Sequence, residues 1–253
     1  MPDLKIKSDK LCKSFSVSGG ESLQVLKDIS FDVYDGDFVA VLGPSGSGKS
    51  TLLGILSGIQ SYDSGSLVVP PPDEIGYVFQ KARLLPWRTV TENLEITRAA
   101  RGRLRGAPFE LSVEEYLAAV GLSDYGGFYP AAISGGMQQR VSIARALATE
   151  PQMLLMDEPF SALDEMTART QRGFLRRLWE ANRPTIVFVT HNVMEAVSLA
   201  TSIIVVSDRP GRVLDHIKVD APYPRDPADP AVSALHHKVL SLLGVDEVDH
   251  ASM

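Results

Sequence analysis

The chain has 253 residues, of which 44% are hydrophobic, and its formal net charge at pH 7 is -6. A chain of this length supports a hydrophobic core by itself, and its single cysteine, Cys12, excludes a disulfide within the chain. The acidic balance argues against general binding to nucleic acid or to an anionic membrane surface. No apolar run is long enough to span a bilayer, and the polar N-terminal residues do not resemble a signal peptide. We therefore expect a cytoplasmic protein that, if it serves a membrane process, docks onto another polypeptide.

Residues 4–35 alternate between apolar and polar side chains in places, which predicts half-buried antiparallel strands. Turns are expected at 16–22, which contains two consecutive glycines, and at 34–37. The run 38–42 is entirely apolar and is typical of a buried parallel strand, whereas 51–56 carries apolar residues at helical spacing.

The segment between that strand and that helix reads Gly-Pro-Ser-Gly-Ser-Gly-Lys-Ser and matches the phosphate-binding pattern G-x-x-x-x-G-K-[ST] in full. Its glycines let backbone N–H groups wrap around a polyphosphate, whose negative charge the helix dipole favours. Lys49 adds a positive charge between the β- and γ-phosphates, and the Ser50 hydroxyl is a ligand for Mg²⁺. A glycine-rich turn with a chance lysine is a poor alternative in this context. The predicted nucleotide-binding residues here are Gly43, Pro44, Ser45, Gly46, Ser47, Gly48, Lys49, Ser50 and Thr51.

Further along the chain, residues 60–74 look like a loop because they contain Gly65 and three consecutive prolines. A short strand at 75–79 ends at Gln80. Helical spacing then dominates, and we interpret residues 81–150 as an inserted helical subdomain with helices expected at 91–100, 113–120 and 137–148.

Strands and helices alternate in the next part of the chain, which indicates a parallel sheet covered on both faces. Strands are expected at 153–156, 186–189 and 203–206, and helices at 165–181 and 192–199. Residues 222–230 hold four prolines and predict an extended linker, after which 232–243 forms a short amphipathic helix.

Two acidic residues, Asp157 and Glu158, end the strand at 153–156. A carboxylate at the C-terminal edge of a parallel sheet suits binding of Mg²⁺, and a second one there can polarise the attacking water as a general base. The alternative, a plain acidic turn, fits the position after a buried strand less well.

Ser134, Gly135 and Gly136 precede a helix and form a second predicted anion-binding nest. Because the first loop already holds the phosphates from one side, a second nest is most simply explained by two copies of the chain that sandwich the nucleotide.

Together these elements resemble the ATP-binding subunit of an ABC transporter, in family order and over nearly the whole chain. The matching segments are the phosphate loop, Gln80, the signature Ile133-Ser134-Gly135-Gly136-Met137-Gln138-Gln139-Arg140, Asp157-Glu158, Ser161-Ala162-Leu163-Asp164 and the switch histidine His191. The resemblance implies an α/β P-loop NTPase fold with a RecA-like parallel-sheet core, an N-terminal antiparallel β subdomain and the helical insertion. The cassette would occupy residues 1–220, and the proline-rich linker and final helix residues 221–253.

The resemblance also implies catalytic roles for Lys49, Gln80, Glu158 and His191, with ATP as the nucleotide. Ser50, Gln80 and Asp157 would organise Mg²⁺, Glu158 would activate water, and His191 would contact the γ-phosphate. Ser134, Gly135, Gly136 and Gln138 would face the ATP of a second, head-to-tail copy, with Asp164 across the dimer interface. Phe15 is the best candidate to stack on adenine, although a phenylalanine at a strand end is more often part of a core.

Met137 replaces the glutamine that most signatures have, and this variant occurs in a subset of importers. That subset also has a Leu-Leu-Pro-Trp run after the loop glutamine and a Pro-Arg pair in its tail. Here Leu84-Leu85-Pro86-Trp87 and Pro224-Arg225 match them, so the resemblance is to importers of nitrate, sulfonates, taurine and related small solutes. It implies permease subunits as partners, a solute-binding protein as an indirect partner, no nucleic acid, and a peripheral location on the cytoplasmic face of the plasma membrane. Trp87 either helps to form a groove for the permease or belongs to the subdomain core.

Two other classes remain as alternatives. A soluble ABC protein of translation or DNA maintenance usually joins two cassettes or carries a long coiled coil, and neither feature is present. An exporter ATPase is mildly disfavoured by the 84–87 element.

Overall fold

The computed structural model describes residues 3–16, 21–105, 109–161 and 163–244, apart from the side chains of residues 105 and 182. The chain divides into two compact units, residues 1–69 with 189–253, and residues 70–188. The turn predicted at 16–22 falls largely outside the described residues.

An antiparallel sheet in the first unit has the strand order β2-β1-β4. It consists of β1 (Leu4–Ser16), β2 (Ser22–Tyr34) and β4 (Ser64–Val68), and the first two confirm the predicted antiparallel pair. The expectation that 60–74 is only a loop was wrong, because β4 pairs with β1 there. Sequence patterns miss β4 because it is a largely exposed edge strand that begins Ser-Gly-Ser and has no apolar alternation. A Cβ on Gly65 would lie 2.5 Å from the Lys10 carbonyl oxygen, so the strands meet through close backbone approach.

A second group of strands in the first unit carries the phosphate loop. Every residue of β3 (Phe38–Leu42) is buried, as its apolar run predicts, and β3 pairs in parallel with β8 (Ser202–Val206). Helix α6 (Val193–Leu199) packs on β3, and α1 (Lys49–Leu56) follows the loop. Strand β9 (Val213–Lys218) joins β8 in the antiparallel direction, so the sheet is mixed at this edge rather than wholly parallel.

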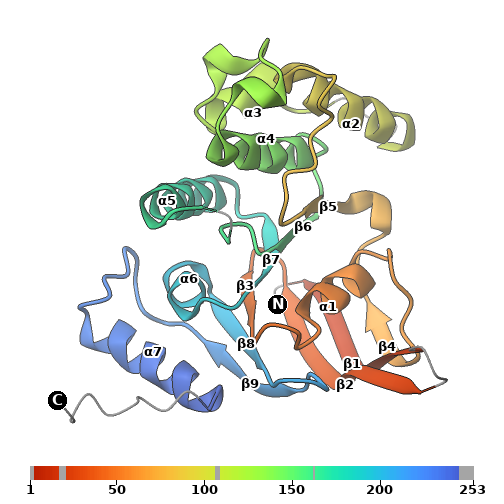
Figure 1. Cartoon of the computed structure of the whole chain (residues 1–253), viewed down its shortest axis with the longest axis vertical. Helices are drawn as coiled ribbons and strands as arrows, with labels where there is room; N and C mark the ends of the chain where they lie inside the picture. Colours follow the sequence, from red (N-terminus) through yellow and green to blue (C-terminus); the bar gives the residue numbers. More distant parts are fainter. Residues whose placement is uncertain (1–2, 17–20, 106–108, 162, 245–253) are drawn as a thin grey trace. The chain divides into compact units, whose positions relative to one another are not determined.

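In the second unit, β5 (Ile75–Val78) and β6 (Met153–Asp157) pair in parallel. The helical insertion is confirmed: α2 (Val90–Arg105), α3 (Val113–Ala119) and α4 (Gly135–Leu147) pack on one another, as Figure 1 shows. Helix α5 (Glu165–Asn182) contacts α4, and β7 (Thr185–Thr190) contains the division between the units. Among the described residues, no helix combines the length and the hydrophobicity needed to cross a bilayer.

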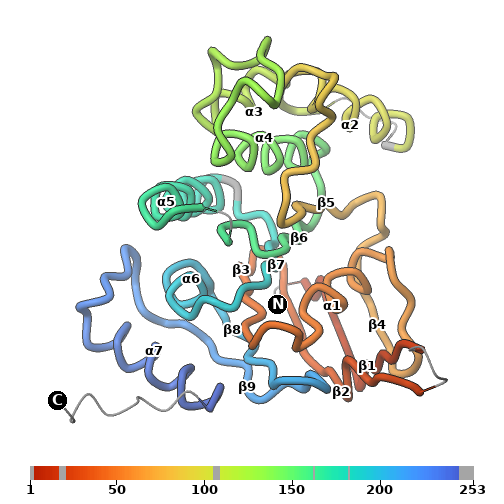
Figure 2. The backbone as a smooth tube through the Cα atoms, in the orientation of Figure 1, coloured from red at the N-terminus to blue at the C-terminus, as the bar shows by residue number. Residues whose placement is uncertain are grey.

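Residues 222–230 precede α7 (Pro230–Leu242) without forming a strand, yet they are not a detached linker (Figure 2). The Arg225 side chain is only 9% exposed, and its guanidinium donates hydrogen bonds to the carbonyl oxygens of Val197 at 2.7 Å and Ala200 at 2.6 Å. The hydroxyl of Tyr223 donates to the Leu199 carbonyl at 2.6 Å, and the guanidinium stacks on its ring. The segment therefore clasps the C-terminal end of α6 and satisfies carbonyls that a helix end leaves unpaired.

We predict that Arg225→Met lowers the free energy of unfolding by about 3 kcal/mol, because it leaves buried carbonyl oxygens without donors. Urea titration of the nucleotide-free protein measures this change. The matched control is Arg212→Met, since Arg212 is exposed, and its effect should stay within about 0.5 kcal/mol. Equal stability of the two variants would contradict the proposed clasp.

Candidate active site

The phosphate loop joins the buried strand β3 to the N-terminus of α1, as the sequence predicts. Lys49 is buried, and its Nζ donates hydrogen bonds to the carbonyl oxygens of Gly43 and Pro44, both at 2.8 Å. These bonds fold the ammonium group back over the loop, while Ser50 in the first helical turn is exposed. The first turn of α1 contains no acidic residue, so the helix end keeps the positive potential that attracts phosphate.

The glycines of the loop are needed for two reasons. They let a phosphate approach the backbone, and they let the loop pack against neighbouring strands. A Cβ on Gly43 would lie 2.6 Å from the Val206 carbonyl oxygen, which belongs to the neighbouring strand β8. Gly48 has φ +95, where side chains are strained, and its Cβ would lie 2.7 Å from a methyl carbon of Leu26. The loop is therefore pressed against two strands of the first unit.

Two residues far along the chain also hold the loop, and the sequence patterns did not reveal them. Arg209 donates from Nε and Nη2 to the Gly46 carbonyl oxygen at 3.2 and 3.0 Å. A Cβ on Gly211 would lie 2.3 Å from the Ser47 carbonyl oxygen. No local motif marks them, because they reach the loop only through the pairing of β8 with β3. Their one sequence signal is the turn composition of Arg209-Pro210-Gly211.

His191 directly follows β7 and is exposed. Its neighbours are fixed: the Thr190 hydroxyl donates to Glu195 Oε2 at 2.5 Å and accepts from the Asn192 backbone N–H at 3.0 Å. Asn192 in turn caps α6 by accepting from the Glu195 N–H at 3.2 Å. The backbone on either side of His191 is thus held rigidly. Phe15 of β1 is 38% exposed. This exposure fits a surface that stacks on adenine better than it fits a residue of the core.

In the second unit, β5 and β6 run in parallel, so their C-terminal ends meet at one edge. Gln80 follows β5, and its Nε2 donates to Glu158 Oε2 and to the Ser161 hydroxyl, both at 3.1 Å. The structure therefore brings together two residues to which the family resemblance assigned roles in hydrolysis. Glu158 has φ +43, a strained conformation that is common at functional sites. Burial, with a smaller contribution from the Asp157 charge, raises the pKa of Tyr77 on β5.

The signature residues lie at the N-terminus of α4. The Ser134 hydroxyl caps the helix by accepting from the Met137 N–H at 3.3 Å, and the space around Gly135 is open. A Cβ on Gly136 would lie 2.9 Å from Cγ2 of Thr167 on α5, so this glycine permits close helix packing.

Two further predicted residues make local contacts. Gln138 donates from Nε2 to the carbonyl oxygens of Pro130 and Ile133, at 3.0 and 3.3 Å, and so braces the turn before α4. Asp164 caps α5 by accepting from the Thr167 N–H at 2.9 Å. Hydrogen bonds from the backbone and side chain of Thr167 lower the pKa of Asp164, which keeps this exposed carboxylate ionised.

The residues expected to organise Mg²⁺ are a serine, a glutamine and one aspartate: Ser50, Gln80 and Asp157. Within the described part of the chain, no three His, Cys, Asp or Glu side chains gather into a metal-binding group. The predicted set needs no such group, because Mg²⁺ keeps several waters and binds one or two carboxylates together with substrate phosphates. These oxygen donors suit that ion.

Comparison with known proteins decides the family. The model of the family described as ABC transporter matches residues 26–161. The chain belongs to the ABC transporter family. It is an ABC ATPase, and two curated relatives cover most of its length. The aliphatic sulfonates import ATP-binding protein SsuB 2 of Rhizobium johnstonii is 43% identical over 88% of this chain and 86% of its own. An uncharacterised ABC transporter ATP-binding protein of Methanocaldococcus jannaschii is 38% identical over 97% and 93%.

Solved structures agree with this assignment and confirm the predicted fold class. A dimeric ATP-binding cassette in a post-hydrolysis state, bound to ADP and Pi, superposes with a TM-score of 0.73 at 30% identity, over 86% of this chain and 100% of that one. CbiO1 of Clostridium perfringens, part of the ABC transporter complex cbiONQ, gives 0.70 at 25% identity, over 85% and 89%.

We predict that Gly211→Ala weakens ATP binding about tenfold, equivalent to about 1.4 kcal/mol, because the new methyl group displaces the Ser47 carbonyl and with it the phosphate loop. Isothermal titration calorimetry measures the affinity. Gly127→Ala is the control, since a Cβ at Gly127 meets nothing within 4 Å. Unchanged affinity in Gly211→Ala would mean that this contact does not shape the loop.

Proposed function

We propose that this ABC ATPase drives import of a small oxyanion or sulfonated solute, of the nitrate, sulfonate and taurine type, through a membrane permease. The observation that carries the proposal is identity of 39 to 43% over most of both chains with proteins named as aliphatic sulfonates import ATP-binding proteins. The run Leu84-Leu85-Pro86-Trp87 supports import rather than export.

In the proposed chemistry, Lys49 and the backbone of the phosphate loop bind the β- and γ-phosphates of ATP. Ser50, Gln80 and Asp157 would hold Mg²⁺, which neutralises phosphate charge when it is bound. Glu158 takes a proton from the attacking water. The hydrogen bond from Gln80 Nε2 supports this role, because it orients the Glu158 carboxylate at the end of β6.

We further propose a head-to-tail homodimer in which Ser134, Gly135 and Gly136 bind the γ-phosphate of the ATP held by the second copy. His191 contacts the γ-phosphate within its own copy, and Asp164 links the two sites across the interface. Support comes from the dimeric cassettes among the structural neighbours and from the exposed Ser134 and Gly135 at a helix N-terminus.

Substitution of Glu158 tests the proposed chemistry most directly. We predict that Glu158→Gln preserves ATP affinity, because the substitution keeps the shape of the side chain, but slows turnover by about 100-fold or more through loss of the base. It should also sediment as a dimer in ATP, since the nucleotide is no longer consumed. The control is Glu114→Gln on an exposed position of α3. Hydrolysis at the wild-type rate in Glu158→Gln would refute the assigned base.

A groove of about 520 Å³ in the second unit is the proposed docking site for a helix of the permease. Gln80, Leu84, Pro86 and Gln138 are among its lining residues. Beside it in sequence, Trp87 is 68% exposed, so the alternative that Trp87 belongs to the subdomain core is wrong. Exposed Phe128 and Tyr129 add apolar surface, and the Phe128 carbonyl accepts from the Val90 N–H at 2.8 Å, which ties them to the start of α2.

A groove of this kind couples ATP hydrolysis to the membrane because Gln80 lines it and also contacts Glu158. The permease subunits would hold the protein at the cytoplasmic face of the membrane. A solute-binding protein would be an indirect partner, since it meets the permease on the opposite side.

We predict that Trp87→Asp abolishes uptake of a radiolabelled alkanesulfonate in cells whose own copy of the gene is deleted, because a charge replaces the apolar anchor. The purified variant should hydrolyse ATP at the wild-type rate. Leu104→Asp, which changes an equally exposed residue of α2, should transport normally. Normal uptake with Trp87→Asp would exclude this anchor, and failure of the wild-type gene to restore uptake would exclude sulfonate as the solute.

A further inference from the structure

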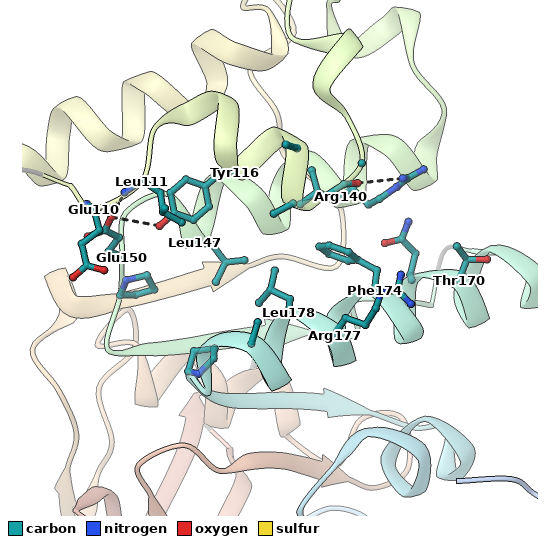
Figure 3. Close-up of a pocket in the computed structure, with 18 residues that line it drawn as sticks. Glu110, Leu111, Tyr116, Arg140, Leu147, Glu150, Thr170, Phe174, Arg177 and Leu178 are labelled. Atoms are coloured by element: carbon teal, nitrogen blue, oxygen red, sulfur yellow. Dashed lines mark hydrogen bonds between the residues drawn. The ribbon is translucent and has the colours of Figure 1, made fainter. Parts of the chain in front are cut away.

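The second unit contains a cavity of about 740 Å³ to which the proposed hydrolysis assigns no role (Figure 3). It is lined by α3, α4 and α5, and it is separate in its lining residues from the groove beside Gln80. Cavities of this size hold small-molecule ligands in other proteins.

The middle of the cavity is apolar. Leu147, Phe174 and Leu178 project toward it and lie between two polar ends, as Figure 3 shows. Leu178 is only partly covered although it is a large apolar side chain on α5. A ligand with an apolar body would bury this surface.

Two buried polar atoms at the cavity have no hydrogen-bond partner among the described residues. Gln171 is only 2% exposed, and its Oε1 accepts no hydrogen bond. Arg140 Nε is also buried and unpaired, whereas Nη1 of the same guanidinium donates to the Val120 carbonyl at 3.2 Å. Buried polar groups in native proteins are almost always satisfied, and both atoms are covered in this conformation, so a ligand satisfies them when the two side chains turn toward the cavity that they line.

The two ends of the cavity differ in charge. At one end, Glu150 Oε1 is already saturated by the backbone N–H groups of Glu110 at 2.6 Å and Leu111 at 3.3 Å and by the Tyr116 hydroxyl at 3.5 Å. The other end holds Arg140 and Arg177, and within the described residues Arg177 forms no ion pair. Guanidinium groups bind carboxylates and sulfonates well, so the open end favours an anion.

We propose that this cavity binds an organic anion: an aryl or branched alkyl carboxylate or sulfonate that also carries an N–H or O–H donor. The acidic group pairs with Arg140 and Arg177, and the apolar body lies against Phe174 and Leu178. The Gln171 amide turns toward the cavity to accept from the donor of the ligand.

Occupancy of the cavity controls ATP hydrolysis through Gln171. Its Nε2 donates to the carbonyl oxygen of Gly136 at 3.4 Å, and Gly136 belongs to the signature at the start of α4. A ligand that fixes the Gln171 amide therefore acts on the backbone of the anion nest. This step rests on the proposed role of the signature in binding the γ-phosphate, whereas the binding step does not.

The test uses anilinonaphthalene sulfonate, which combines aromatic rings, a sulfonate and an N–H donor and fluoresces when bound. Titration is done on the full chain with saturating ADP, so that the nucleotide site is filled. We expect saturable binding that Arg177→Gln and Gln171→Leu each weaken about tenfold. Arg169→Gln is the matched control, because Arg169 lies on the same helix but does not line the cavity. Arg177 is exposed, so its replacement does not threaten folding.

The same probe tests the control of hydrolysis. We expect a saturating concentration to change the ATPase rate of the wild type and of Arg169→Gln at least twofold, and to leave Gln171→Leu unaffected at a concentration that saturates that variant. Equal affinity of Arg177→Gln and Arg169→Gln would overturn the binding site. Normal binding without any change in rate would overturn the coupling through Gln171, and neither result would bear on the Glu158 test of hydrolysis itself.

Discussion

The phosphate loop depends on close contacts that leave no room for side chains on its glycines. Val206 lies against Gly43, Leu26 lies against Gly48, and the Lys49 ammonium folds back onto two carbonyl oxygens of the loop. A loop held in this way keeps its N–H groups available for phosphate, because the surrounding strands and not the ligand impose its shape. Preorganisation of this kind is what makes electrostatic stabilisation of a transferring phosphoryl group effective.

In the second unit, hydrogen bonds between side chains hold the candidate catalytic residues in place. Parallel pairing of β5 with β6 brings the ends of two strands, distant in sequence, to one edge, where the Gln80 amide contacts both Glu158 and Ser161. Gln80 also lines the groove proposed for the permease, so one side chain connects the proposed general base with the proposed docking surface. The positive φ of Glu158 is the local strain that this arrangement tolerates.

Helix α5 connects the remaining parts of that unit. Its N-cap is Asp164, Thr167 one turn later packs against Gly136, and Gln171 after another turn donates to the same glycine. The residue proposed for the dimer contact, a neighbour of the signature and a residue of the cavity thus lie on successive turns of one helix. A helix is stiff along its axis, which makes α5 suited to transmit a change at the cavity to the signature.

Local patterns in the sequence determined most of the fold and nearly all of the candidate site. The phosphate loop lies between its buried strand and helix, the helical insertion forms, and Ser134 and Asp164 cap the helices they precede, because glycine runs, apolar periodicity and capping residues act over a few positions. Strand β4 escaped prediction because it is largely exposed. Strand β9 escaped because an exposed leucine, Leu214, and a less exposed aspartate, Asp215, hide its alternation of burial. Only the tertiary structure placed Arg209 and Gly211 against the phosphate loop, buried Arg225 in a proline-rich segment, and left Oε1 of Gln171 without a partner among the described residues. These features arise from contacts between residues far apart in the chain, and no local pattern encodes which distant backbone will arrive beside a given side chain.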